Sequence, residues 1–248
     1  MDTLNLGRFP RGTCALDELG YILRRHVQCS MTEPALYFKQ LEIGPMANFI
    51  YLIGDPASRV AAVVDPAWDV DRIVQTAEKD GYSIGHVLVT HGHPDHINGV
   101  EELLNRTDAQ LHMHKSETPW MKGWKATATP RSHGDELKIG NLVLTFVHTP
   151  GHTPGSQCFL VQNRLVSGDT LFINSCGRTD LPGGDPEQLY DSLAHRLSKL
   201  DDNVVLFPGH NYAGQPTSTM GEQKRHNPFL RSASLNDFLA MVRPKFSL

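Results

Sequence analysis

The chain has 248 residues, of which 40% are hydrophobic and 20% charged, and its formal net charge is −4 at pH 7. This composition is typical of a globular protein with a sizeable core, and the slightly acidic balance argues against a nucleic-acid partner. No apolar run approaches the roughly 18 residues that a membrane span needs, and residues 1–23 lack the apolar core of a secretory signal. The four cysteines form no Cys-x-x-Cys pair and predict no disulfide framework, so we expect a cytoplasmic protein.

The first 33 residues have weak hydrophobic periodicity, and we interpret them as an N-terminal extension. Periodic structure begins only after Met31, which makes this residue an alternative start of the chain. The remaining residues, 34–248, are expected to form one domain. Apolar alternation and short apolar runs predict strands at 37–43, 48–53, 60–64, 86–89, 110–114, 136–139, 142–147, 157–161, 164–167 and 204–207.

Apolar residues at helical spacing predict the helices. The first of them has Asp69 as its N-cap and Gly81 just beyond its end. Strand blocks with helices between them and at the ends predict a layered α/β protein whose sheets are covered by helices. The predicted helices are 70–79, 97–104, 187–200, 218–225 and 235–242.

Three histidines and an aspartate follow one predicted strand within six residues, in the segment Thr-His-Gly-His-Pro-Asp-His. Alternate residues of an extended segment point the same way, so His91 and His93 can face one point. A turn at Pro94 then lets Asp95 and His96, at the start of the next helix, face a neighbouring point. Imidazole nitrogen and carboxylate oxygen suit zinc, iron and manganese, so the segment predicts two adjacent metal ions.

Three further residues lie on glycine-containing loops that follow predicted strands. They are His152 in Thr-Pro-Gly-His-Thr-Pro-Gly, Asp169 in Ser-Gly-Asp-Thr and His210 in Phe-Pro-Gly-His. Functional residues concentrate on such strand-end loops. A metal pair lowers the pKa of bound water toward about 7 and polarises a carbonyl, so these residues predict hydrolytic chemistry. Within it, Asp95 is both a ligand and the catalytic residue that orients the attacking hydroxide.

The ordered set Thr-His-x-His-x-Asp-His, then His152, Asp169 and His210, resembles the metallo-β-lactamase superfamily over about residues 37–230. The resemblance implies an αββα sandwich with two metal ions at the edge between the sheets. By that resemblance zinc is the expected metal, with iron or manganese as alternatives. The implied ligands are His91, His93 and His152 for the first ion, Asp95, His96 and His210 for the second, and Asp169 for both.

Residues 176–185, Cys-Gly-Arg-Thr-Asp-Leu-Pro-Gly-Gly-Asp, resemble two branches of that superfamily. The Pro-Gly-Gly stretch is similar to glyoxalase II, a hydroxyacylglutathione hydrolase that cleaves a thioester with a metal-bound hydroxide. The Cys-Gly-Arg-Thr-Asp stretch is similar to persulfide dioxygenase, which implies a single Fe(II) on His91, His152 and Asp169. We favour the hydrolase because the Pro-Gly-Gly stretch accompanies the full two-metal ligand set. The short C-terminal tail leaves glutathione in doubt as the thiol.

Two residues are candidates for substrate binding. The guanidinium of Arg178 can grip a substrate carboxylate in a bidentate fashion, and the alternative is an ion pair with Asp180 or Asp185. Tyr212 can hydrogen-bond the substrate, and the alternative is packing at the rim. We expect a small-molecule acyl-thiol or persulfide substrate, no nucleic-acid or membrane partner, and a homodimer as one possible assembly. A non-catalytic binding module, or a lactonase or β-lactamase side activity, are further alternatives.

Four other side chains are candidates for positions near the site. Cys176 is either a pocket thiol or, more commonly, a small buried hydrophobe. His112 and His114 alternate in one predicted strand, and His148 precedes the loop of His152, where it can support a ligand from behind.

Overall fold

The computed structural model describes residues 33–117 and 127–242, which belong to one unit. The predicted N-terminal extension therefore lies almost wholly outside the described residues, and its boundary stays a prediction. No helix in these two ranges is long and apolar enough to cross a membrane.

Two six-stranded sheets form the centre of the unit, and their strand orders are β1-β2-β3-β4-β5-β6 and β14-β13-β10-β9-β8-β7. The first sheet consists of β1 (Tyr37–Ile43), β2 (Asn48–Asp55), β3 (Val60–Val64), β4 (Ser83–Leu88), β5 (Gln110–His114) and β6 (Thr129–Arg131). The second consists of β7 (Glu136–Ile139), β8 (Leu142–His148), β9 (Gln157–Val161), β10 (Arg164–Gly168), β13 (Val205–Pro208) and β14 (Ser218–Thr219). A small hairpin of β11 (Leu171–Phe172) and β12 (Ser175–Cys176) follows β10.

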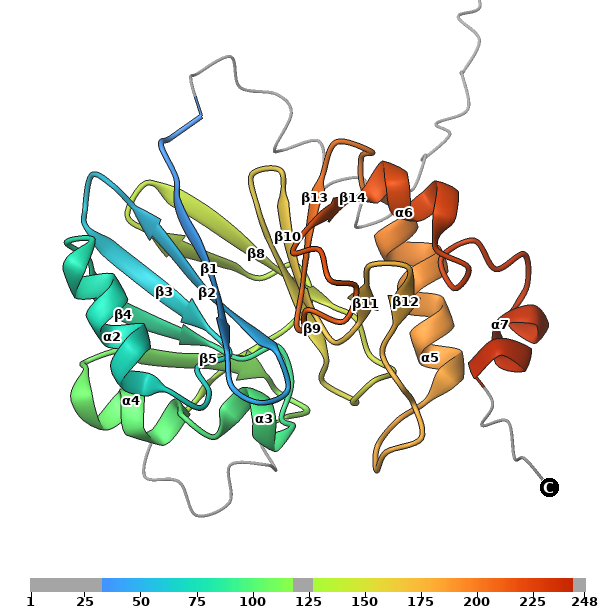
Figure 1. The fold of residues 1–248 in the computed structure, drawn as a ribbon, viewed down its shortest axis with the longest axis horizontal. Coiled ribbons are helices and arrows are strands. Elements are labelled where there is room, and N and C mark those ends of the chain that lie inside the picture. The colour runs from blue at the N-terminus through green and yellow to red at the C-terminus, as the bar shows by residue number, and fades with distance from the viewer. Residues whose placement is uncertain (1–32, 118–126, 243–248) are drawn as a thin grey trace, which may run out of the picture. The chain divides into compact units, whose positions relative to one another are not determined.

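Helices flank both sheets, which makes the unit an αββα sandwich (Figure 1). The first sheet carries α2 (Val70–Lys79), α3 (Pro94–Ile97) and α4 (Val100–Arg106). The second carries α5 (Pro186–Asp191), its continuation η2 (Ser192–Arg196) and η3 (Leu197–Lys199), and α6 (Met220–His226). Helix α7 (Leu235–Val242) packs against α5. The predicted fold class is confirmed.

The core between the sheets is apolar and aromatic. Strands β2, β8 and β9 contribute Tyr51, Phe146 and Phe159, each at most 1% exposed. On the other face of the first sheet, α2 and α4 bury Ile73 and Leu103. Each such apolar side chain contributes about 1.5–3 kcal/mol by leaving water. Strand β2 is buried along its whole length because both of its faces are covered.

Many predicted boundaries agree with the structure. The predicted strands 60–64, 110–114, 136–139 and 157–161 and the helices 70–79 and 235–242 have the predicted ends. The side chain of Asp69 caps α2 by accepting a hydrogen bond from the amide of Arg72 at 2.9 Å. Gly81, just beyond that helix, has φ +80°, the left-handed conformation that favours glycine.

The predicted single helix 97–104 is wrong, because the structure breaks it into α3 and α4 at Asn98 and Gly99. The amide of Gly99 donates to the carbonyl of Pro66 at 3.1 Å instead of continuing the helix. A Cβ at Gly99 would lie 2.9 Å from that same carbonyl oxygen, so only glycine allows this approach. The break brings the residues of α3 against the loop that follows β3.

The predicted helix 187–200 is also irregular, although its apolar face is confirmed. It begins as α5, widens into a π-helical segment at Ser192–Arg196 and ends in a 3₁₀ turn. The hydroxyl of Ser192 donates to the carbonyl of Pro150 at 2.7 Å, which ties the wide turn to the loop of His152. The wider turn keeps leucines that are four residues apart on one buried face, and these are Leu189, Leu193 and Leu197.

The shortest strands, β6, β11, β12 and β14, have two or three residues and were not predicted. Two of the residues assigned to the helix 218–225 form β14, which pairs with β13. The helix α6 begins at Met220, because Thr219 and Glu222 form a reciprocal capping box at its N-terminus.

Candidate metal centre

The predicted ligands converge from strand ends of both sheets. His91 and His93 follow β4, and α3 presents Asp95 and His96 one turn later. His152 follows β8, Asp169 follows β10 and His210 follows β13. The amide of Phe49, at the start of β2, donates to the carbonyl of Gly209 at 2.8 Å and joins the two sheets beside the site. The edge between the sheets is therefore where the ligands meet.

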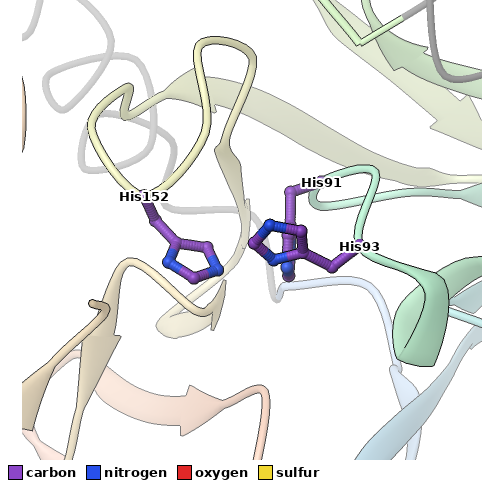
Figure 2. Close-up of side chains that lie close together, drawn as sticks. All are labelled: His91, His93 and His152. Atoms are coloured by element: carbon purple, nitrogen blue, oxygen red, sulfur yellow. The ribbon is translucent and has the colours of Figure 1, made fainter. Parts of the chain in front are cut away.

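The first group consists of His91, His93 and His152, which Figure 2 shows pointing toward one another from two loops. One ligand atom from each lies within 4.8 Å of the other two. The ring centroids are 4.6 to 4.7 Å apart, and the rings stand almost perpendicular to one another. Three imidazoles therefore face one point, as predicted.

The second group consists of Asp95, His96 and His210, whose ligand atoms also lie within 4.8 Å of one another. Nε2 of His96 and Nε2 of His210 are 3.1 Å apart, and each lies 3.4 Å from Oδ2 of Asp95. The Asp169 carboxylate lies between the groups, 3.6 Å from Nε2 of His152 and 3.4 Å from Nε2 of both His96 and His210. All seven predicted ligands are thus brought together.

The other ring nitrogen of four histidines has a partner that fixes the ring. Nδ1 of His152 donates to the carbonyl of Arg178 at 2.7 Å, and Nδ1 of His210 donates to the carbonyl of Met46 at 2.9 Å. In the same way, Nδ1 of His91 bonds the hydroxyl of Thr90 and Nδ1 of His96 bonds Asp65. Such partners select the tautomer that leaves Nε2 for a metal ion.

Asp65 is a functional residue that the sequence reasoning missed. Its buried carboxylate accepts hydrogen bonds from the amide and hydroxyl of Thr90 at 2.7 and 2.6 Å and from His96 at 2.9 Å. It also lies within 4.8 Å of ligand atoms of His91 and His96, but its oxygens are already engaged. We therefore interpret it as a positioning residue. The sequence feature that could have identified Asp65 is its position directly after the buried strand β3, on a strand-end loop like those of the ligands.

Asn48 is a second missed residue. Its amide Nδ2 donates to both Oδ2 and the main-chain oxygen of Asp95, each at 3.0 Å. Its own oxygen accepts from Nε1 of Trp68 at 2.9 Å, which fixes the orientation of the amide. Trp68 is 40% exposed and has φ +66°, an unfavourable conformation for an aromatic residue. This chain of contacts holds the carboxylate of Asp95 in place.

The two ligand groups differ in the pKa values of their histidines. Burial, reinforced by the neighbouring His152, lowers the pKa of His93 to about 4, and burial also holds the pKa of His91 well below its usual value. Burial alone would lower the pKa of His210, but the carboxylates of Asp169 and Asp95 outweigh it and raise that pKa to about 9. At neutral pH His91 and His93 are neutral, while the second group contains protonated imidazole beside carboxylate.

Orphaned polar atoms show that the residues fit metal ions. Nε2 of His91, Nε2 of His152 and Oδ1 of Asp169 are buried and have no hydrogen-bond partner among the described residues. Such a buried atom costs about 1–3 kcal/mol unless something satisfies it. A cation facing these lone pairs would remove that cost, and the set of nitrogen and carboxylate oxygen donors suits zinc, iron or manganese.

The predicted substrate residues lie beside the two groups. The carbonyl of Arg178 holds His152, while its side chain is 62% exposed and pairs with both oxygens of Asp180 at 2.6 and 2.7 Å. Asp185 instead caps α5. The ring of Tyr212 is exposed and stacks on His210 with centroids 4.6 Å apart. Substrate contacts of Arg178 and Tyr212 stay predictions.

The remaining candidates lie around the site rather than in it. Cys176 lines a shallow cavity of about 300 Å³ together with Arg178, and burial raises the pKa of its thiol to about 12. His112 is buried and bonds His86 and Arg131. The rings of His114 and His148 stack at 3.8 Å, and Nε2 of His148 donates to the carbonyl of Pro154, in the loop of His152.

The chain belongs to the metallo-β-lactamase superfamily, because the model of that family matches residues 43–210. It is 32% identical to the hydroxyacylglutathione hydrolase GloC of Haemophilus influenzae over 215 residues, which are 78% of this chain and 99% of the relative. It is 29% identical to the mitochondrial persulfide dioxygenase ETHE1 of mouse over 233 residues, which are 88% of this chain and 85% of the relative.

Among solved structures, the chain is similar to ETHE1 from Myxococcus xanthus, with a TM-score of 0.77 and 36% identity. The match covers 84% of this chain and 90% of the other. Both branches suggested by residues 176–185 are thus represented among the relatives, at similar identity. The protein is therefore a member of an enzyme superfamily and has a cluster of side chains suited to binding metal ions.

Proposed function

We propose that this protein is a two-metal thioester hydrolase of the glyoxalase II type, acting on an acyl-thiol such as an acyl-glutathione-like ester. The observation that supports it is the position of Asp169. Its carboxylate lies within 3.4–3.6 Å of Nε2 atoms from both ligand groups, as a ligand shared by two ions would. A one-metal reaction would use the Asp169 carboxylate for a single ion and would leave Asp95, His96 and His210 without an ion to hold.

Zinc is the proposed metal because the donors are five histidine nitrogens and two carboxylates. His91, His93 and His152 would hold one ion, Asp95, His96 and His210 the other, and Asp169 both. When bound, the ions lower the pKa of a coordinated water and polarise the thioester carbonyl.

The protein's own residues orient the reactants. Asp95, held by Asn48, accepts a hydrogen bond from the attacking water and aims it at the carbonyl carbon. The ring of Tyr212 stacks on His210, and its hydroxyl would hydrogen-bond the substrate. Arg178 binds a carboxylate of the thiol part, and its exposed ion pair with Asp180 exchanges readily because such pairs contribute little stability.

Persulfide dioxygenation is the second candidate, favoured by the 36% identity to ETHE1 from Myxococcus xanthus. In that case His91, His152 and Asp169 would hold a single Fe(II) as a two-histidine, one-carboxylate set. His93, Asp95, His96 and His210 would then support those ligands from behind.

Two assays on the same purified full-length protein separate the candidates. One measures thiol release from acyl-glutathione esters, and the other measures oxygen uptake with glutathione persulfide. We expect thiol release without oxygen uptake. Rapid oxygen uptake without thioester cleavage would contradict the hydrolase and establish the second candidate.

A further inference from the structure

A buried carboxylate lies behind the first ligand group. Glu117, in the turn after β5, is 0% exposed. No lysine, arginine or histidine of the described residues forms an ion pair with it. A buried carboxylate without an ionic partner is costly unless hydrogen bonds compensate for its lost hydration. The hydrogen bonds of Glu117 therefore indicate its role in the structure.

Glu117 accepts three hydrogen bonds from two loops. Its Oε2 accepts from the amide of Gly92 at 2.8 Å. Its Oε1 accepts from the hydroxyl of Thr153 and from the amide of Gly155, each at 2.7 Å. A Cβ at Gly155 would lie 2.5 Å from Cγ of Glu117, so glycine is needed for this close approach.

These partners are neighbours of the ligands in the chain. Gly92 separates His91 from His93, and Thr153 follows His152. One side chain therefore joins the two loops that carry the whole first group. Hydrogen bonds to a carboxylate are stronger than those between neutral groups, so the three bonds fix the separation of the loops.

We propose that Glu117 is the positioning residue of the first metal ion, setting the spacing of His91, His93 and His152 and strengthening their affinity for the ion. This inference rests on the metal centre of the proposed function but not on the reaction performed there. Affinity at the first group depends on Glu117, whereas affinity at Asp95, His96 and His210 depends on Asp65 and Asn48.

Glu117→Gln is the main test, because it preserves the size of the side chain. The glutamine oxygen still accepts from Thr153 and Gly155, but its NH₂ faces the amide of Gly92, donor against donor. We expect zinc affinity of the first group to fall by about 10–100-fold, the usual effect of losing a residue that supports metal ligands. Competition titration against a chromophoric chelator measures it, with the variant also made in His210→Ala protein, where the second group is broken.

Asp55→Asn is the matched control. Asp55 is another buried carboxylate, 2% exposed, which accepts from the amides of Ala57, Ser58 and Asn141 at 3.1–3.2 Å. It holds loops that carry no ligand. We expect Asp55→Asn to lower the melting temperature while leaving both zinc affinities unchanged.

Thr153 supplies a milder variant if Glu117→Gln folds poorly. Thr153→Val removes one of the three bonds and should weaken zinc binding by a few-fold, and Thr153→Ser should restore it. Unchanged zinc affinity in Glu117→Gln, or an equal loss in Asp55→Asn, would overturn the proposal. Normal zinc binding by a wild-type protein without thioesterase activity would instead contradict the proposed function and leave this inference standing.

Discussion

The two ligand groups of the metal centre differ in the contacts that their side chains make. In the group of His91, His93 and His152, buried nitrogen atoms point at one another, and two of the rings have an Nε2 without a partner among the described residues. In the group of Asp95, His96 and His210, the side chains already pair with one another as imidazole and carboxylate. The first group therefore contains unsatisfied buried nitrogen atoms, while the second pairs imidazole with carboxylate.

This difference predicts an order of binding. An ion entering the first group would satisfy unpaired lone pairs and displace no proton from His91 or His93, because both pKa values are lowered, that of His93 to about 4. An ion entering the second group must break existing pairs and expel protons from His96 and His210, whose pKa values are raised. We therefore expect tighter, less pH-dependent binding at the first group, with Asp169 coupling the two.

Removing the shared carboxylate should have the largest effect. Asp169→Ala takes a ligand from both groups, so kcat/KM for thioester hydrolysis should fall on the order of 10³-fold, since one ion provides several kcal/mol. Elemental analysis should show fewer than two metal ions per chain. Asp202→Asn, which changes a surface carboxylate paired with Lys224, is the control and should behave as wild type.

Removing a residue that supports the second group should lower the affinity for the second metal ion more than that for the first. Asp65→Asn loses an acceptor for Nδ1 of His96, so zinc affinity of the second group should fall by about 10–100-fold. The first group should lose less, because Asp65 reaches His91 only through Thr90. Zinc titration of the variant measures both constants, and a larger loss at the first group would contradict the assignment.

A substitution at Arg178 tests whether this one residue both positions His152 and binds the substrate. Its carbonyl holds His152, but the proposed substrate contact uses its side chain, so Arg178→Ala separates the two roles. We expect KM to rise by about 10-fold, from the loss of a charge-assisted hydrogen bond, with unchanged metal content. Asp180→Asn, which frees the guanidinium, should not raise KM. A fall in metal content in Arg178→Ala would show that the side chain matters for folding of the loop.

The free energy of unfolding of the metal-free protein should depend on pH through histidines of both ligand groups. Between pH 6.5 and about 9 the folded state binds more protons than the unfolded state, because the pKa of His210 is raised to about 9. The free energy of unfolding should therefore fall as pH rises through this window. Between pH 4 and 6.5 the lowered pKa of His93 gives the opposite sign, so stability should rise with pH. Chemical denaturation at several pH values tests this, and His210→Ala should flatten the alkaline fall.

The ligands were predictable because each one follows a strand in a short motif with its own turn. His152, Asp169 and His210 are far apart in sequence, yet strand ends bring them to one edge of the sandwich. The residues that support them were harder to find. Asp65 has a strand-end position like the ligands, but its contact with His96 joins residues far apart in sequence. The contacts of Glu117 with the loops of His91 and His152 are likewise distant in sequence. The break at Gly99 was missed for the same reason, because it depends on the carbonyl of Pro66 approaching from another loop.

The most direct test of two ligand groups sharing Asp169 is the number of metal ions per chain. Elemental analysis of full-length protein, purified without added metal and then equilibrated with buffered zinc, gives that number. We expect close to two ions for the wild type and close to one for His210→Ala. A wild-type protein that retains a single iron and takes up no second ion would contradict the two-metal hydrolase.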